Sequence, residues 1–222
     1  MERLIDQELE ELNKDILKMG ALAEEAIYKS IEALKNREKD IAKSVIDNDM
    51  NIDKLELEID EKCIDLIARY QPVAGDLRFI TTGMKINAEL ERIADIAVDI
   101  AQRTLEIADK PLLKPLIDIP KLAAVAQNMV KTSIDAFVKG DIALAKKVML
   151  SDSEADQLRN TIQRELIEDY MVKDSATAPR AVQLLLIARF LERICDHTTN
   201  IAEDVIYMVQ AEVVRHHPEK LK

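Results

Sequence analysis

The hexapeptide “LERIAD” at residues 90–95 returns as “LERICD” at residues 191–196, and this repetition decides the expected fold. Residues 19–60 also align without a gap on residues 122–163, at an offset of 103. Matching pairs include Ala23 with Ala126, Ser30 with Ser133, Asp49 with Asp152 and Asp53 with Asp156. At the hexapeptides the offset is 101, so one turn is two residues shorter in the second half. Such self-similarity indicates a duplicated structural unit.

The composition predicts long helices. Of the 222 residues, 48% are hydrophobic and 33% are charged, with four Gly, six Pro and no Trp. Few chain breakers and few aromatic residues are typical of long helices. The net charge of −11 argues against binding to nucleic acids or anionic lipid surfaces, which need basic patches. The apolar runs are far shorter than the ~20 residues that span a bilayer. With only Cys63 and Cys195, read as buried reduced thiols, we expect a cytoplasmic protein without direct membrane insertion.

Chain breakers divide the sequence into six helical stretches. Apolar residues recur every three or four positions, and no stretch alternates as a strand would. The expected helices cover about residues 6–35, 39–70, 77–108, 121–139, 142–171 and 180–214. The proline-rich “DKPLLKPLIDIP” at residues 109–120 joins the halves, and short loops elsewhere make neighbouring helices antiparallel. We therefore predict an all-α fold of two tandem, sequence-duplicated three-helix bundles, residues 1–110 and 120–222, with a linker at residues 111–119.

Four pairs of acidic residues occupy repeat-matched positions, each pair with i, i+4 spacing. This spacing puts both carboxylates of a pair on one helix face, one turn apart. Both pairs of the first half lie roughly 30 Å from the turn near Val73, at about 1.5 Å per residue. The second half repeats this geometry around a turn near Ser175. We therefore expect four carboxylates to converge in each bundle: Asp49/Asp53 with Glu91/Asp95, and Asp152/Asp156 with Glu192/Asp196.

Converging carboxylates need protons, basic partners or a cation. Oxygen ligands suit hard cations such as iron, manganese, magnesium or calcium, so we hypothesise one metal site per bundle. Asp99 and its counterpart Asn200 continue the same faces, and a mixed site with His197 is conceivable. Arg92 and Arg193 adjoin the glutamates, but neighbouring side chains on a helix do not face each other. The alternative is that these acids form solvated helix faces, because the chain has 42 acidic residues.

The turn “QPVAGDLR” at residues 71–78 is the most distinctive short string. Pro72 and Gly75 suit a turn, and Asp76 can cap the helix that follows. Arg78 has no counterpart at the offset of 101, because Pro179 stands there, so Arg78 is a candidate for contact with a partner. The sequence carries no Glu-x-x-His, phosphate-binding glycine loop, nucleophile elbow or Cys-x-x-Cys. We therefore expect a binding protein rather than an enzyme.

The string “QPVAGDLR”, followed by “ELERIADIAVDIA” and later by “FLERICDHTTNIAEDV”, closely resembles the PhoU family of bacterial regulators of phosphate uptake. The resemblance covers about residues 5 to 213. It implies a cytoplasmic adaptor between the ATPase subunit of a phosphate ABC transporter and a membrane sensor histidine kinase. Such an adaptor helps to repress the phosphate-starvation regulon when phosphate is plentiful, and a homodimer would fit the family.

The resemblance also bears on the acidic pairs. Some family members carry multinuclear iron or zinc clusters on their acid-x-x-x-Asp motifs, whereas others contain no metal. The resemblance thus implies ligands at Asp49, Asp53, Glu91, Asp95, Asp152, Asp156, Glu192 and Asp196. The difference between Asp99 and Asn200 implies that the two sites need not be equivalent. The alternative function is a carboxylate-bridged metal-binding or metal-storage protein.

Overall fold

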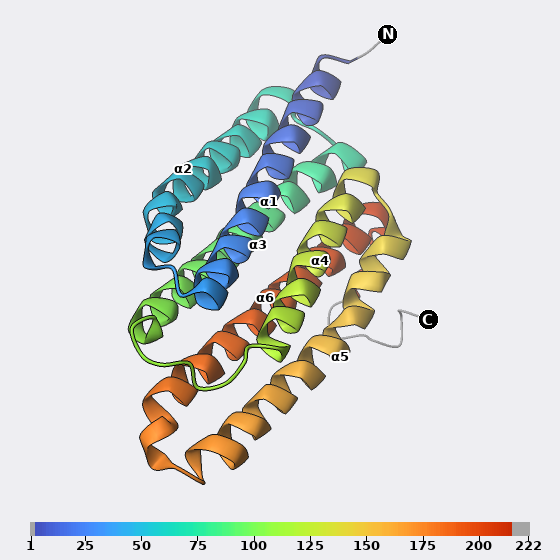
Figure 1. Ribbon diagram of the computed structural model, residues 1–222. Helices are drawn as coiled ribbons and strands as arrows, with labels where there is room; N and C mark the ends of the chain where they lie inside the picture. The colour runs from blue at the N-terminus through green and yellow to red at the C-terminus, as the bar shows by residue number, and fades with distance from the viewer. Residues whose placement is uncertain (1–2, 215–222) are drawn as a thin grey trace.

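The computed structural model describes residues 3–214, which form six long α-helices (Figure 1). The first half contains α1 (Leu4–Asn36), α2 (Lys39–Tyr70) and α3 (Ala74–Ile107). The second half contains α4 (Asp118–Lys139), α5 (Ile142–Glu165) and α6 (Ala178–Gln210). No strand occurs within residues 3–214, so the all-α prediction is confirmed. The predicted units at residues 1–110 and 120–222 include ends outside the described residues, and that division stays a prediction.

The junction between α4 and α5 follows from two adjacent residues. Gly140 ends α4 in the left-handed conformation, at φ +59°, which glycine adopts without steric cost. Asp141 then caps α5, because its side chain accepts hydrogen bonds from the backbone N–H groups of Ala143 and Leu144. The sequence “KGD” therefore fixes where the second antiparallel hairpin turns.

Two helix ends differ from the sequence-based expectations. Helix α3 begins at Ala74, so Asp76 lies inside its first turn instead of capping it, and the expected cap is wrong. Asp76 accepts a hydrogen bond from Arg3 at 2.7 Å and places a negative charge near the positive end of the helix dipole. Helix α5 continues as a π-helix over Leu166–Met171, a change of winding that periodicity in the sequence did not indicate.

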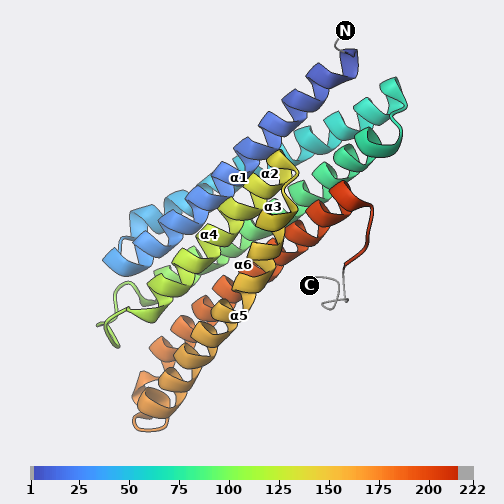
Figure 2. The same ribbon diagram turned by 90° about the vertical axis from the view of Figure 1, so that its right-hand side faces the viewer.

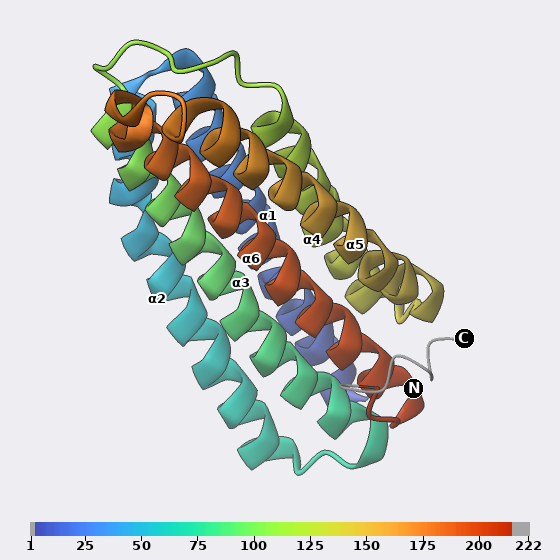
Figure 3. The ribbon, with the colours of Figure 1, turned by 90° about the horizontal axis from the view of Figure 1, so that it is seen from below.

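The two halves join along α3 and α6, which lie antiparallel (Figure 3). Polar contacts bridge this pair, among them Arg78 Nε donating to Met208 O at 3.2 Å, Lys85 Nζ donating to Asp204 Oδ1 at 2.9 Å, and Glu89 Oε2 lying 2.6 Å from His197 Nδ1. The partners step backward along α6 as they step forward along α3. Continued by the same steps, this register brings Ile93 of α3 opposite Ile194 of α6, its own match in the repeat. The halves are therefore related by an approximate twofold axis through this point.

A continuous hydrophobic core extends through both halves. Helix α1 also packs along α4, as Figures 1 and 2 both show. A Cβ atom on Gly20 of α1 would lie 3.1 Å from Ile134 of α4, so glycine permits this close approach. Phe79 of α3 and Phe137 of α4 stack with ring centroids 5.1 Å apart. The bundles thus share buried surface in addition to their covalent linker.

Cationic side chains hold the linker between α3 and α4 against the bundle. Arg37 donates to the carbonyl oxygens of Ala108 and Lys110, and Arg180 donates to that of Pro111 at 3.1 Å. These contacts satisfy backbone groups that proline-rich sequence leaves without helical partners. The linker therefore has a defined conformation, held by these side-chain contacts to the helices.

Candidate functional site

The first acidic cluster lies between α2 and α3. Asp49 and Asp53 come from α2 and Asp95 from α3, and each offers a carboxylate oxygen within 4.8 Å of the others. Within residues 3–214, these residues form the only group of three His, Cys, Asp or Glu side chains whose ligand atoms lie this close. The structure thus brings together three of the four acids expected in the first half.

Asp49 is the partly buried aspartate of this cluster on α2. Burial, followed by the charges of Asp53 and Asp95, raises the pKa of Asp49 to about 6. Its Oδ1 atom is buried without a hydrogen-bond partner in the structure. A buried carboxylate oxygen without a donor is unfavourable, and either a proton or a cation would relieve the cost.

Glu91, the fourth expected acid, lies at the edge of the cluster. Burial and the charge of Asp95 raise its pKa, while Arg92 opposes this effect. Arg92 Nε lies 3.5 Å from Glu91 Oε2, and Arg92 Nη1 lies 3.5 Å from Asp95 Oδ2. The expectation that Arg92 would not reach the acids was therefore wrong, because its long side chain folds back along α3. Its own exposure of 64% keeps these contacts weak.

Glu56 is a further acid at this site, and the sequence reading missed it. It lies on α2, three residues after Asp53 and seven after Asp49, so all three share one helix face. Burial, Asp60 and Asp53 raise the pKa of Glu56, and its charge also contributes to the raised pKa of Glu91. Its helical spacing from Asp49 and Asp53 indicates the shared face, but Glu56 has no acidic counterpart in the second repeat.

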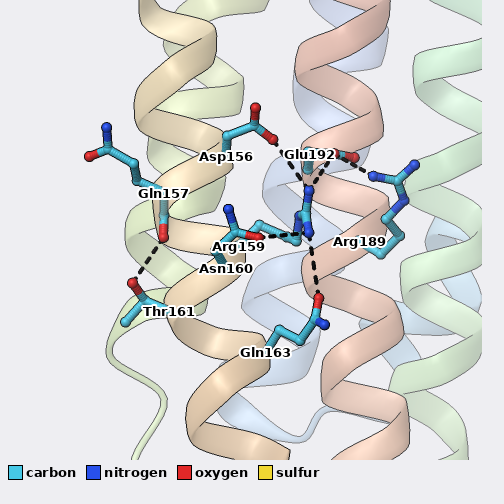
Figure 4. A network of polar contacts seen from close by, with 8 residues as sticks. All are labelled: Asp156, Gln157, Arg159, Asn160, Thr161, Gln163, Arg189 and Glu192. Carbon is cyan, nitrogen blue, oxygen red and sulfur yellow. Dashed lines mark hydrogen bonds and ion pairs between the residues drawn. The ribbon is translucent and has the colours of Figure 1, made fainter.

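The second acidic cluster lies between α5 and α6 and contains arginine (Figure 4). Arg159 Nη2 donates to Asp156 Oδ1 at 3.4 Å and to Glu192 Oε1 at 3.3 Å. Arg189 also donates to Glu192 Oε1. Glu192 is only 5% exposed, and its Oε2 atom has no hydrogen-bond partner. The four expected acids lie near one another here, but two cations share their space.

The remaining acids of this cluster still repel one another. Burial, then the charges of Asp196, Asp156 and Glu192, raise the pKa of Asp152 to about 6. Burial is also the first cause of the raised pKa of Asp196, which Arg189 opposes. The second cluster is therefore partly neutralised by two arginines that contact the buried Glu192, whereas the first has only the weak contacts of the exposed Arg92.

The two clusters differ because the repeats differ at two positions. Arg159 corresponds to Glu56 at the offset of 103, and Arg189 corresponds to Ala88 at the offset of 101. The second cluster thus has Arg159 in place of the acid Glu56, and Arg189 in place of the small residue Ala88. The prediction that the sites need not be equivalent agrees with this chemistry, although the difference lies elsewhere than at Asp99 and Asn200.

The donor set of the first cluster fits a hard cation. Its oxygens suit iron, manganese, magnesium or calcium, whereas zinc more often takes histidine or cysteine ligands. Asp49 Oδ1 is buried without a donor, and this oxygen would gain a partner if such an ion bound. Cys63 is buried, which raises its pKa to about 12, so this thiol stays neutral and is a poor ligand. Cys195, beside the second cluster, has a pKa raised even further by burial and by Asp152.

Other sequence candidates lie in the contact between the halves. Asn200 Nδ2 donates to Glu89 at 3.3 Å, and His197 Nδ1 lies 2.6 Å from the same carboxylate. Asn200 therefore does not continue the second cluster as expected. Arg78 donates to the carbonyl oxygen of Met208 in the last turn of α6, which gives it a structural role. Its contact with a partner stays a prediction.

Comparison with known proteins gives consistent matches over nearly the whole chain. The PhoU domain model matches residues 16–104 and 119–205. The phosphate-specific transport system accessory protein PhoU homolog of Aquifex aeolicus is 42% identical over 216 residues, 97% of each chain. The Escherichia coli accessory protein PhoU is 36% identical over 94% of this chain and 86% of its own. The crystal structure of PhoU from Pseudomonas aeruginosa superposes with a TM-score of 0.89 at 35% identity, covering 93% of this chain and 99% of that one.

Proposed function

The chain belongs to the PhoU family, and from this membership we propose that it is an accessory and regulatory protein of phosphate transport. The observation that carries the proposal is the match of both repeats, together with relatives of nearly equal length named as accessory proteins of phosphate-specific transport. A regulatory protein from Streptococcus pneumoniae supports it further, with a TM-score of 0.87 at 29% identity.

We propose that the protein works as a cytoplasmic adaptor between the transporter ATPase subunit and a sensor histidine kinase. It would help to keep the phosphate-starvation regulon repressed when phosphate is plentiful. Its action would be binding rather than catalysis, for which long helices with acidic faces offer broad surfaces complementary to basic partners. In residues 3–214, every helix is too short or too polar to cross a bilayer. Dimerisation is a further expectation from the family.

A bound cation would strengthen the contact between α2 and α3. Asp49, Asp53 and Asp95 would hold it, with Glu56 and Glu91 alongside. A hard metal ion such as iron or manganese would supply positive charge at Asp49, where the structure places no cation within residues 3–214, since Arg92 contacts only Glu91 and Asp95. Asp49 would then remain ionised near neutral pH, and the two helices would be tied together. We propose that this cluster binds a cation more strongly than the second, where Arg159 and Arg189 already provide positive charge.

The direct test of the proposed function is genetic. Deletion of the gene should make a phosphate-starvation reporter constitutive in phosphate-rich medium, and the wild-type chain supplied in trans should restore repression. Co-purification should recover the transporter ATPase and the kinase from the same cells. Normal repression in the deletion strain would refute the proposal, whatever metal the protein binds.

Metal storage is the second candidate function, and the close carboxylate triad is the observation that favours it. It predicts loading with many ions per chain after anaerobic incubation with Fe(II), measured by elemental analysis. A few ions per chain, unaffected by excess iron, would instead favour a structural or regulatory ion in an adaptor.

A further inference from the structure

The outer face of α2 carries an exposed apolar stripe. Met50, Leu57 and Ile64 are 77%, 62% and 59% exposed, respectively. They are spaced seven residues apart, which is close to two helical turns, so they lie in one line about 21 Å long at 1.5 Å per residue. We call these three residues the α2 stripe. Large exposed apolar side chains that recur along one helix face mark an interaction surface more often than isolated ones do.

The fold does not require the α2 stripe. The buried face of α2 consists of other residues, among them Ile52, Leu55 and Ile59. In the second repeat, the positions of Met50 and Leu57 are the exposed polar residues Ser153 and Asn160 on α5. A helix with the same place in its bundle therefore forms without apolar residues there. Ile64 alone keeps its residue type, as Ile167.

Acidic side chains border the α2 stripe on both sides. At 100° per residue, Asp47 and Glu61 lie on one flank, and Asp53 lies on the other. Asp47, Asp53 and Glu61 are exposed to solvent. Two exposed lysines lie on the same side of α2: Lys54, which is 3.6 Å from Glu58, and Lys43, seven residues before Met50, and the acids outnumber them. The surface is thus apolar along its centre and negative along its edges.

We propose that the α2 stripe is a docking surface for an amphipathic helix of a partner protein. That helix would present apolar residues at heptad spacing between flanking lysines or arginines, which would meet the acids on both sides. A second copy of this chain would place like charges along each edge, and an anionic membrane would be repelled. The inference goes beyond the proposed function, because the binding of such a helix to the α2 stripe does not depend on which pathway the protein regulates.

The test uses the full chain and a synthetic helical peptide of about 21 residues, with leucine at heptad positions and lysine on both flanks. Binding is measured by fluorescence anisotropy against the wild type and a Met50→Ser/Leu57→Asn variant. This variant carries the residues of α5 and leaves every charge unchanged. Because two apolar side chains lose their contact, we expect its Kd to be at least about tenfold weaker. Leu150→Ser, which removes a 74% exposed leucine from α5, is the matched control and should bind normally.

The outcomes separate the possible occupants. Hydrogen exchange should show protection of α2 in the complex, and a peptide with glutamate in place of lysine should not bind. No binding to the wild type, or equal binding to the double variant, would overturn the proposal. The proposal would also be overturned, in favour of a second copy of the chain, if the wild type and the Leu150→Ser control sedimented as dimers and the double variant as a monomer. Unchanged far-UV circular dichroism of the double variant excludes misfolding. The deletion phenotype tests the proposed function separately, and its result does not depend on whether the peptide binds.

Discussion

Asp49 should destabilise the metal-free protein at neutral pH, and Asp49→Asn should relieve this cost. Burial and neighbouring carboxylates raise its pKa from an ordinary 3.8 to about 6, so the folded state binds a proton more tightly than the unfolded state does. Stability therefore falls as pH rises from about 4 through about 6. Asparagine keeps the shape without the charge, so the variant should lack this decline.

The size of the effect follows from the pKa shift. Full conversion at 1.36 kcal/mol per pKa unit would give about 3 kcal/mol. Asp49 is partly exposed, however, and solvent screens the repulsion, so roughly 1 kcal/mol is the realistic expectation. For a chain of this length, that corresponds to a rise in Tm of about 2–4 °C. At pH 4, where the wild-type carboxyl is protonated, the two proteins should be nearly equal.

Urea denaturation followed by circular dichroism, with EDTA present, measures the difference between pH 4 and pH 8. Asp47→Asn, two residues earlier on the exposed side of α2, is the control and should change little at either pH. A variant at Asp49 that is less stable than the wild type at pH 8 would refute the reasoning. That result would mean that the carboxylate has favourable partners and is not a source of repulsion.

Three further predictions concern the clusters and the contact between the halves. Without chelator, MnCl2 at a hundredfold excess over its Kd should stabilise the wild type by about 2.7 kcal/mol in thermal melts. The Asp95→Asn variant should lose this gain, and the Glu192→Gln variant should keep it. The reverse pattern would place the cation in the second cluster. Arg159→Ala should lower the free energy of unfolding by roughly 2–3 kcal/mol in urea denaturation, since it leaves the buried Glu192 with fewer compensating charges. Adding Glu192→Gln should recover most of this loss. No recovery would contradict the electrostatic cause. Arg78→Ala should lower the free energy of unfolding by about 1 kcal/mol, because the carbonyl of Met208 loses a donor. Unchanged stability would contradict the structural role of Arg78.

The helices were predictable because their signals are local. Spacing of apolar residues indicated six helices, and Gly140 with Asp141 marked a turn through backbone freedom and capping. The antiparallel contact between α3 and α6 was not predictable in the same way. It depends on pairs such as Glu89 with His197, which are 108 residues apart and carry no periodic pattern. The π-helical end of α5 likewise depends on its tertiary surroundings.

The candidate site was predictable only in outline. Helical rise placed both acid pairs of each half at one height, and the structure places Asp49, Asp53 and Asp95 together. Glu56 was not predictable from the similarity of the repeats, because its counterpart is Arg159. Differences between repeats therefore held the information about chemistry, whereas their similarities held the information about fold.

The approximate twofold relation between the halves makes this chain a dimer of bundles on one polypeptide. In a homodimer of single bundles, any substitution would alter both acidic clusters at once. Here a codon change at position 159 reaches one cluster only, so the first can keep an acid, Glu56, where the second gains an internal cation, Arg159. Fusion of the two bundles thus allows a symmetric scaffold to evolve two unlike sites. It also allows one outer helix, α2, to gain apolar residues that its counterpart α5 lacks.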